Sequence, residues 1–332
     1  MTDKRLGQLT HWLKRVLNQE EVDISVASAD ASFRRYYRIQ TPQNPAGKSW
    51  VVMDAPPDKE DCQPFVDVCE AFHQMNVNVP AIVAQDIEQG FLLLTDFGST
   101  CFLDELNETS ADQLYGDAMA ALLRLQTNEK PKNVSLPPYD DALLMREMML
   151  FPDWFLAKHL NAEPDSLVIK MLTDAFAKLS GMALNQPRVW VHRDYHSRNL
   201  MVFDKNNPGV IDFQDAVEGP ITYDLVSLLR DCYISWPDAQ VNAWASDYLH
   251  QLQQKNACLD VSEAEFIKWF DWMGIQRHLK AIGIFARLNY RDGKAGYLLD
   301  IPRTLNYVVT VSSRYPELCE FNQFVSQIKL PV

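Results

Sequence analysis

Two short segments of this chain carry the residue types that phosphoryl transfer requires. The first, residues 192–199, places Asp194 and Asn199 five positions apart, directly after a short apolar run. The second places Asp212 at the end of another apolar stretch. In phosphoryl transfer from Mg-ATP, one carboxylate orients the attacking hydroxyl and accepts its proton, while an Asn and a second carboxylate hold the metal. The spacing therefore predicts Asp194 as the catalytic base and Asn199 and Asp212 as ligands of Mg²⁺, which prefers hard oxygen donors.

Two histidines of the same segment are candidates for further roles. His192 and His196 stand two positions before and two positions after Asp194. An imidazole can transfer a proton near neutral pH or fix a neighbouring group by a hydrogen bond. We expect His192 to support the loop from behind, and we place His196 in the catalytic set, in contact either with Asp194 or with the substrate.

Composition and charge restrict the classes of protein that this chain can belong to. Its 332 residues are enough for one large domain or for two lobes with substantial cores. The net charge of −13 argues against nucleic acid and against an anionic membrane surface as partners, because both require clustered basic residues. No segment has the apolar pattern of a signal peptide or a membrane span. The six cysteines are scattered and form no CxxC pair, so we expect reduced thiols in a cytoplasmic protein.

The hydrophobic pattern divides the chain into a strand-rich first part and a helical second part. The first part is predicted to contain helices at 6–18 and 61–75, and strands within 28–39 and at 49–53, 80–83 and 90–94. The second part is predicted to contain helices at 110–126, 140–160, 165–184, 221–254 and 262–290. We expect an α+β fold of two lobes, 1–97 and 98–332, with the ligand site in the cleft between them.

The motifs resemble those of the aminoglycoside phosphotransferases and related small-molecule kinases, which share the bilobal protein-kinase-like fold. The catalytic loop of that family reads H-x-D-x-H-x-x-N, which is matched here by His192, Asp194, His196 and Asn199. The metal strand reads I-D-F/W-x-x-A, which is matched by Ile211, Asp212, Phe213 and Ala216. The pair Asp224-Leu225 fits the start of the helix that braces the site. The resemblance extends from about residue 24 to 300, and it implies a small antiparallel-sheet lobe that binds ATP and a larger helical lobe that carries the substrate site.

Within that family the chain is most similar to the sugar kinases of cell-wall recycling, which phosphorylate the anomeric hydroxyl of N-acetylmuramate and N-acetylglucosamine. Residues 30–38, 53–57 and 276–280 carry this finer likeness. It implies ATP and Mg²⁺ as cofactors and an amino sugar as acceptor, with no indication of oligomeric state. The alternatives are an aminoglycoside kinase, a choline- or homoserine-type kinase, and a pseudokinase that binds nucleotide without turnover.

The predicted nucleotide-binding end departs from the usual kinase pattern. Kinase-like folds place glycines over the phosphates and a Lys on the third strand. Residues 28–33 contain no glycine, and Met53-Asp54 stands near the place expected for the Lys, with Lys48 too far toward the start of that strand. The missing glycines and Lys motivate the pseudokinase alternative, whereas the intact Asp194, Asn199 and Asp212 argue against it.

Three arginines that follow the glycine-free turn are candidates for the missing positive charge. Arg34, Arg35 or Arg38 could bind the phosphates, since a guanidinium suits phosphate geometry. The alternative is a solvated strand face. We assign Ser32, Arg34 and Arg35 to the predicted nucleotide site.

The segment Asp96-Phe97-Gly98 has the letters of the metal-binding DFG motif of protein kinases. It precedes the catalytic loop, however, whereas in the kinase order the metal-binding Asp follows that loop. Asp212 therefore takes the metal role, and we interpret residues 95–98 as the hinge. We expect the nucleotide base to lie against Leu94, Asp96 and Phe97.

Candidate substrate-binding residues lie in the helical part of the chain. We select Asp215 and the basic segment that contains Arg277, His278 and Lys280. Arg277, Lys280, Arg287 and Arg291 can share one helical side. A polycationic aminoglycoside would require carboxylates in the site, whereas the lactyl carboxylate of a muramic acid derivative would favour an Arg or a Lys. The alternative is a solvated basic stripe.

Overall fold

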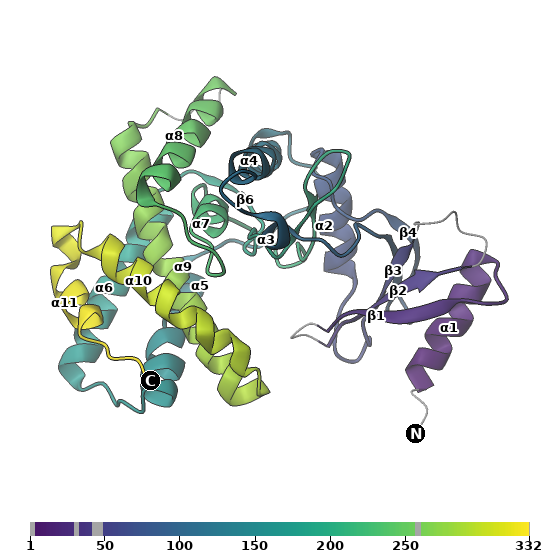
Figure 1. The fold of residues 1–332 in the computed structure, drawn as a ribbon, viewed down its shortest axis with the longest axis horizontal. Coiled ribbons are helices and arrows are strands. Elements are labelled where there is room, and N and C mark those ends of the chain that lie inside the picture. Colours follow the sequence, from purple (N-terminus) through teal and green to yellow (C-terminus); the bar gives the residue numbers. More distant parts are fainter. Residues whose placement is uncertain (1–3, 30–32, 42–48, 256–259, 332) are drawn as a thin grey trace. The chain divides into compact units, whose positions relative to one another are not determined.

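The chain forms two compact units in the computed structural model, which describes residues 4–29, 33–41, 49–255 and 260–331 (Figure 1). The first unit comprises Met1–Glu105, Glu129–Val134 and Asn199–Asp215. The second comprises Leu106–Asn128, Ser135–Arg198 and Ala216–Val332. This division differs from the single boundary expected after residue 97, because the segment with the predicted metal ligands packs with the first unit.

A five-stranded antiparallel sheet forms the centre of the first unit, in the order β1-β2-β3-β5-β4 (Figure 1). The strands are β1 (Asp23–Ala29), β2 (Arg35–Gln40), β3 (Trp50–Asp54), β4 (Ile82–Asp86) and β5 (Phe91–Thr95). The expected strands are confirmed, although β1 begins at Asp23, before the expected start at residue 28. Its first residues are Asp, Ile and Ser, and this mixture gives a weaker alternation than the residues of β2.

The two faces of this sheet have different neighbours. The apolar side of α1 (Lys4–Leu17) packs on one face, in a core formed by Leu9, Trp12, Leu13, Tyr37, Ile39, Val52, Phe91 and Leu93. Successive side chains of a strand point to opposite faces. Val51 and Leu94, which neighbour Val52 and Leu93, therefore point to the other face, where they line a cavity.

The segment Asn199–Asp215 adds a small hairpin to the first unit. β7 (Leu200–Met201) pairs with β8 (Gly209–Val210). The N–H of Val210 donates to the carbonyl of Asn78 at 2.7 Å. Further along, the buried ring of Phe213 packs against Phe65 and Phe72 of α2 (Gln63–Gln74), with ring centroids 4.8 and 5.8 Å apart. These contacts fix both ends of the segment that carries Asn199 and Asp212.

The second unit is built around α9 (Glu263–Asp292), a helix of 30 residues. The hydroxyl of Ser262 caps its first turn, and Gly293, in the left-handed region at φ 70°, ends it. α5, α6, α7, α8 and α10 all contact it. The helices of this unit are α4 (Ala111–Thr127), α5 (Asp141–Met148), α6 (Ser166–Leu184), α7 (Tyr223–Leu229), α8 (Asp238–Gln254), α10 (Ile301–Ser312) and α11 (Cys319–Ser326). The strands β6 (Arg188–Val191) and β9 (Val217–Pro220) pair antiparallel beside them.

The expected α+β class, with an antiparallel sheet first and helices later, is confirmed. Two of the expected long helices are divided. The helix expected at 140–160 is α5 followed by a π-helix, Phe151–His159, with a proline in its first turn. The helix expected at 221–254 is interrupted between α7 and α8, where Pro237 precedes α8. None of the helices that the structure describes is both long enough and apolar enough to span a membrane.

Gly283 sets how closely α9 approaches the start of the π-helix. A Cβ at this position would lie 2.4 Å from the carbonyl carbon of Leu150 and 2.5 Å from its oxygen. We expect Gly283→Ala to lower the free energy of unfolding by about 1–3 kcal/mol, because backbone must move to admit the methyl group. Urea unfolding measures the change.

A matched substitution in α6 provides the control. A Cβ at Gly181 would meet nothing within 4 Å, so Gly181→Ala should raise the free energy of unfolding by about 0.5–1 kcal/mol through helix propensity. The same effect for both substitutions would contradict the close approach at Gly283.

Candidate active site

The catalytic loop follows β6 and is held by a buried carboxylate of α7. Asp224 accepts hydrogen bonds from the backbone N–H of His192 at 2.6 Å and from that of Arg193 at 3.0 Å. Burial raises the pKa of Asp224 to about 7, although both N–H groups favour its charged form. The pair Asp224-Leu225 therefore braces the loop, as the sequence predicted.

Three further contacts hold the loop from within. Nδ1 of His192 accepts the N–H of Asp194 at 3.2 Å, which agrees with a supporting role for this buried imidazole. The hydroxyl of Tyr195 donates to the carbonyl of Ala118 in α4 at 2.8 Å. The carboxylate of Asp231 accepts the N–H of Ser197 at 2.9 Å. The loop backbone is thus fixed on both sides of Asp194.

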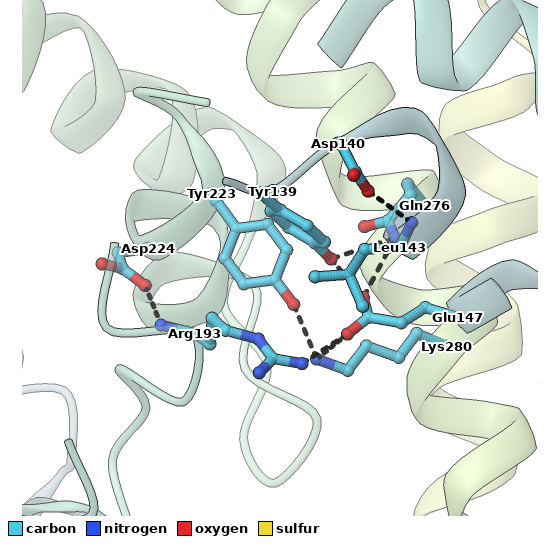
Figure 2. Close-up of polar contacts among 9 residues, drawn as sticks. All are labelled: Tyr139, Asp140, Leu143, Glu147, Arg193, Tyr223, Asp224, Gln276 and Lys280. Atoms are coloured by element: carbon cyan, nitrogen blue, oxygen red, sulfur yellow. Dashed lines mark hydrogen bonds and ion pairs between the residues drawn. The ribbon is translucent and has the colours of Figure 1, made fainter. Parts of the chain in front are cut away.

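Glu147 of α5 connects this loop to α9 (Figure 2). Its Oε1 accepts Nη2 of Arg193 at 2.6 Å and lies 3.1 Å from Nζ of Lys280. Its Oε2 accepts the hydroxyl of Tyr139 and Nε2 of Gln276. Although burial opposes its ionisation, the charges of Lys280 and Arg193 hold the pKa of Glu147 below its ordinary value.

The position of Glu147 is set by the local structure of α5. Asp140 caps this helix by accepting the N–H of Leu143 at 2.9 Å. Lys280, on the other side of Glu147, also donates to the hydroxyl of Tyr223 at 2.9 Å (Figure 2). The buried Lys280, the partly buried Arg193 and one carboxylate therefore form a charged network that includes the loop.

Asp194 lies at a cavity of about 100 Å³ within the second unit. His196, Arg277 and Lys280 also line it, and Tyr233 and Phe285 provide aromatic walls. Burial raises the pKa of Asp194, but the charge of Lys280, assisted by that of Arg193, lowers it below the ordinary value. The carboxylate of Asp194 is therefore ionised near neutral pH, as a proton acceptor must be.

His196 lines the same cavity as a neutral ring. Burial is the largest influence on this residue and lowers the pKa of its imidazole. Its Nδ1 is buried and makes no hydrogen bond to any residue in the described part of the chain. Its ring meets that of Tyr233 edge-on, with centroids 5.4 Å apart. The imidazole therefore has an unused nitrogen at the cavity that holds Asp194.

A second cavity, of about 330 Å³, lies within the first unit on the face of the sheet opposite α1. It is in the size range of pockets that hold small-molecule ligands. Five residues predicted from the sequence line it: Leu94, Asp96, Phe97, Asn199 and Asp212. The structure therefore brings the predicted hinge and the predicted metal ligands together.

Asn199 and Asp212 are close to each other at this cavity. Nδ2 of Asn199 lies 3.3 Å from Oδ2 of Asp212, and Nε2 of Gln214 donates to Oδ1 of Asp212 at 2.8 Å. Asp212 has φ 64°, an uncommon left-handed conformation for a non-glycine residue. The described residues contain no cluster of three or more His, Cys, Asp or Glu that could hold a metal. An amide and a carboxylate nevertheless fit Mg²⁺, which takes few protein ligands and completes its shell with water and phosphate oxygens.

The side chain of Asp96 is engaged within the hinge. It accepts Nε of Arg38 at 2.6 Å, the hydroxyl of Ser49 at 2.5 Å and the N–H of Gly98 at 2.8 Å. Burial opposes ionisation, but these hydrogen bonds together lower the pKa of Asp96. The carboxylate of the DFG-like segment thus holds the backbone of the predicted hinge, and Asp212 is the carboxylate beside Asn199.

Two arginines assigned to the nucleotide lie elsewhere. Arg35 binds the buried carboxylate of Asp54 through Nε and Nη2 at 3.0 and 2.6 Å, and Arg34 pairs with Glu60 at 3.2 Å. Neither lines the 330 Å³ cavity, and this part of the expectation is revised because carboxylates of the same unit already engage both guanidinium groups. Arg38, the third candidate, lines the cavity. Ser32 and Lys48 lie outside the described residues.

Of the predicted substrate residues, the structure places Arg277 and Lys280 at the cavity of Asp194 and two others away from it. His278 is buried, with Nε2 2.9 Å from the carbonyl of Arg230 and its ring stacked on Tyr307 at 4.8 Å. Asp215 is exposed at the end of the first unit and lines neither cavity. Both assignments are revised. His278 is one position from Arg277 along α9 and therefore faces another side of the helix.

The residues of the expected basic stripe on α9 also lie in different environments. Arg291 is exposed and binds Asp292 at 2.8 Å, whereas Arg277 and Lys280 are buried. Sequence reasoning did not find Glu147, which engages Lys280. It carries no motif, and its charged partners are distant in sequence, so no local pattern identifies it.

A sheet with a ligand-sized cavity and a helical unit with the H-x-D-x-H-x-x-N loop are features of a phosphotransferase. A family model described as "Phosphotransferase enzyme family" matches residues 23–261, and the chain belongs to this family. The N-acetylmuramate/N-acetylglucosamine kinase of Pseudomonas putida is 45% identical to it over 98% of this chain and 97% of that protein. The protein of the same name from Neisseria meningitidis is 44% identical over 95% of this chain and 93% of its own length.

Solved structures confirm the protein-kinase-like fold. The chain resembles an ethanolamine kinase of Plasmodium vivax, with a TM-score of 0.66, 11% identity and coverage of 90% of this chain and 86% of that one. It also resembles the choline kinase LicA of Streptococcus pneumoniae, with a TM-score of 0.63, 12% identity and coverage of 92% and 99%. An ADP-bound aminoglycoside phosphotransferase, APH(2'')-Ib, has a TM-score of 0.59, 14% identity and coverage of 92% and 98%.

Glu147→Gln tests the buried network. The substitution removes the charge that balances Arg193 and Lys280, so we expect the free energy of unfolding to fall by about 3–5 kcal/mol. The matched control is Asp174→Asn, which breaks an exposed pair with Lys170 and should leave the free energy of unfolding almost unchanged. Urea unfolding followed by circular dichroism compares the two, and equal losses would show that Glu147 does not hold the network together.

The buried neutral ring of His278 predicts a pH dependence of stability. Burial lowers its pKa from 6.5 to about 3. Because this pKa is lowered in the folded state, the contribution of His278 to the free energy of unfolding is complete above pH 6.5 and is lost as pH falls toward 3. We expect the contribution of His278 to the free energy of unfolding to fall by about 1.4 kcal/mol between pH 7.5 and pH 5.5, one unit below 6.5, over a range in which Asp224 also titrates.

The variant His278→Gln isolates this contribution, because an amide keeps an N–H donor but does not titrate. Its free energy of unfolding should fall less than that of the wild type between these pH values. His11→Gln, at an exposed site of α1, should keep the wild-type dependence. Parallel curves for all three proteins would rule out His278 as the titrating group.

Proposed function

We propose that this chain is an ATP- and Mg²⁺-dependent kinase that phosphorylates the anomeric hydroxyl of N-acetylmuramate and N-acetylglucosamine in peptidoglycan recycling. The observation that carries the proposal is the 45% identity, over nearly the full length of both chains, to a relative named for this activity. The ionised carboxylate of Asp194 at a small cavity supports it chemically.

Asp194 acts on the acceptor hydroxyl. Its carboxylate accepts a hydrogen bond from the hydroxyl, orients the oxygen for attack and receives the proton as the phosphoryl group is transferred. Since the transition state is loose, accurate positioning is the main contribution of this residue. The bonds that Asp224 makes to the loop backbone hold Asp194 in a fixed place during this step.

The 330 Å³ cavity holds the nucleotide in this proposal. The base lies against Leu94, Asp96 and Phe97, with the backbone of the hinge available to its polar edge. Asn199 and Asp212 would hold Mg²⁺, which neutralises charge on the phosphates when bound. Arg38 adds a guanidinium to the same cavity, although this group is paired with the carboxylate of Asp96.

The charge of the acceptor cavity favours a neutral or anionic acceptor over a polycation. Arg277 and Lys280 both line it beside the carboxylate of Asp194, and since Glu147 balances the charge of Lys280, Arg277 is the cation that an acceptor meets. An aminoglycoside would bring further amino groups to these cations, and like charges at short distance in a buried site are strongly unfavourable. His196 offers its unused Nδ1 to a hydroxyl of the sugar.

Asp194→Asn tests the proposed function. With N-acetylmuramate and N-acetylglucosamine as acceptors, we expect ADP release by the variant to be slower than by the wild type by roughly 10²–10⁴-fold, because an amide cannot accept the proton. Affinity for ADP, measured by calorimetry, should change little, since the nucleotide cavity lies in the other unit.

Asp153→Asn, at an exposed site of the π-helix, is the matched control and should keep the wild-type rate. Equal rates for Asp194→Asn and the wild type would refute the role of Asp194. Expression that protects cells from kanamycin-type drugs would refute the choice of acceptor.

A further inference from the structure

The two cations of the acceptor cavity differ in how far the protein neutralises them. Lys280 lies 3.1 Å from the carboxylate of Glu147 and donates to the hydroxyl of Tyr223 at 2.9 Å (Figure 2). Its charge is therefore balanced inside the protein, in the network that also holds Arg193. An anionic ligand gains little from Lys280 unless it displaces Glu147, which is itself bound to Arg193 at 2.6 Å.

Arg277 is about one turn away on α9. Its side chain is buried, and among the described residues its guanidinium donates a hydrogen bond from Nη1 to Sγ of Cys232 at 3.6 Å. The described part of the chain shows no ion pair between this guanidinium and a carboxylate. The nearby carboxylate of Asp231 accepts the N–H groups of Ser197 and Tyr233 at 2.9 and 3.0 Å.

A buried guanidinium with a thiol as its hydrogen-bond partner has donors that a ligand can use. The group carries five N–H donors in a planar fork that matches a carboxylate, whereas Asp231 and Asp194 act on its charge without an ion pair in the described part of the chain. Because Arg277 lines the cavity, a ligand can supply the missing anion. The cavity measures about 100 Å³, which is smaller than the roughly 300–1,000 Å³ that encloses a whole ligand. It therefore suits one substituent of the acceptor.

We propose that Arg277 binds the carboxylate of the lactyl substituent of N-acetylmuramate and so determines how well this sugar is used relative to N-acetylglucosamine. This inference rests on the proposed function. N-Acetylglucosamine has a hydroxyl where N-acetylmuramate has the lactyl ether, so it presents no carboxylate to the guanidinium. Arg277 is thus a specificity residue, and Lys280 belongs to the network that supports the catalytic loop.

A phosphoryl oxygen could also bind the guanidinium of Arg277. Comparison of the two sugars distinguishes a contact to the phosphoryl group from a contact to the lactyl carboxylate. The transferred group is the same for both sugars, whereas the carboxylate is present in only one of them. Loss of a contact to the phosphoryl group would lower kcat/KM equally for both sugars. Loss of a contact to the lactyl carboxylate lowers it selectively for N-acetylmuramate.

The experiment compares kcat/KM for both sugars in the wild type, Arg277→Met and Arg291→Met. Methionine keeps much of the length of the arginine stem without its charge, and Arg291 provides the same change at an exposed site of α9. We expect the ratio of kcat/KM for N-acetylmuramate to that for N-acetylglucosamine to fall roughly 10- to 100-fold in Arg277→Met, as for a lost charged hydrogen bond. The effect should be mainly on KM, and Arg291→Met should keep the wild-type ratio.

A neutral acceptor gives an independent measure. The amide of the lactyl group of N-acetylmuramate should be a poorer substrate than the acid for the wild type, by a similar factor. Arg277→Met should discriminate less between acid and amide. An unchanged sugar ratio in Arg277→Met, or an equal loss for both sugars, would overturn the assignment of Arg277. Failure of the wild type to use either sugar would instead refute the proposed function.

Discussion

The carboxylate of Glu147 is shared by two cations, one buried and one partly buried, that belong to different elements of the helical unit. Arg193 comes from the catalytic loop and Lys280 from α9, while Glu147 itself belongs to α5. Removing three charges from water is expensive, and the arrangement is tolerable only when all three meet with good geometry. The loop, α5 and α9 are therefore fixed relative to one another. The side chains of Asp194 on the loop and of Arg277 on α9 consequently reach the same cavity in a defined arrangement.

The same network determines the protonation states at the acceptor cavity. Lys280 is the largest favourable influence on the charge of Asp194 and lowers the pKa of that carboxyl. At His196, two residues further along, burial outweighs the charges of Asp231 and Asp194, which lowers the pKa of the imidazole and keeps its ring neutral. One cavity thus holds an ionised carboxylate that can accept a proton and a neutral imidazole that can only exchange hydrogen bonds. Local electric fields, and not the identities of the residues alone, produce this division of roles.

Residues defined by a contiguous motif were predictable, and those defined by distant partners were not. Asp194, Asn199 and Asp212 each stand in a short pattern whose order carries the chemistry. The partners of Glu147 lie far away in sequence, so only the fold identifies it. The assignment of Arg35 to the nucleotide was wrong, and alternation along β2 shows why. Tyr37 and Ile39 face α1, so Arg35 lies on that face. Arg38 and Tyr36 point the other way and line the cavity. Helical periodicity separates His278 from Arg277 in the same way.

At its third strand, β3, the first unit has an acidic residue where kinase-like folds usually have a Lys. Asp54 ends β3 near the place expected for a Lys, and Arg5 and Arg35 bind its buried carboxylate at 2.6 Å each. This cluster ties α1 to the sheet, so its cationic groups serve the fold. Arg38 lines the cavity, but its guanidinium is paired with the carboxylate of Asp96. A nucleotide in this cavity therefore meets less fixed positive charge from the sheet than a strand Lys would supply. On the proposed function, the phosphates then depend more strongly on the pair of oxygen donors, Asn199 and Asp212.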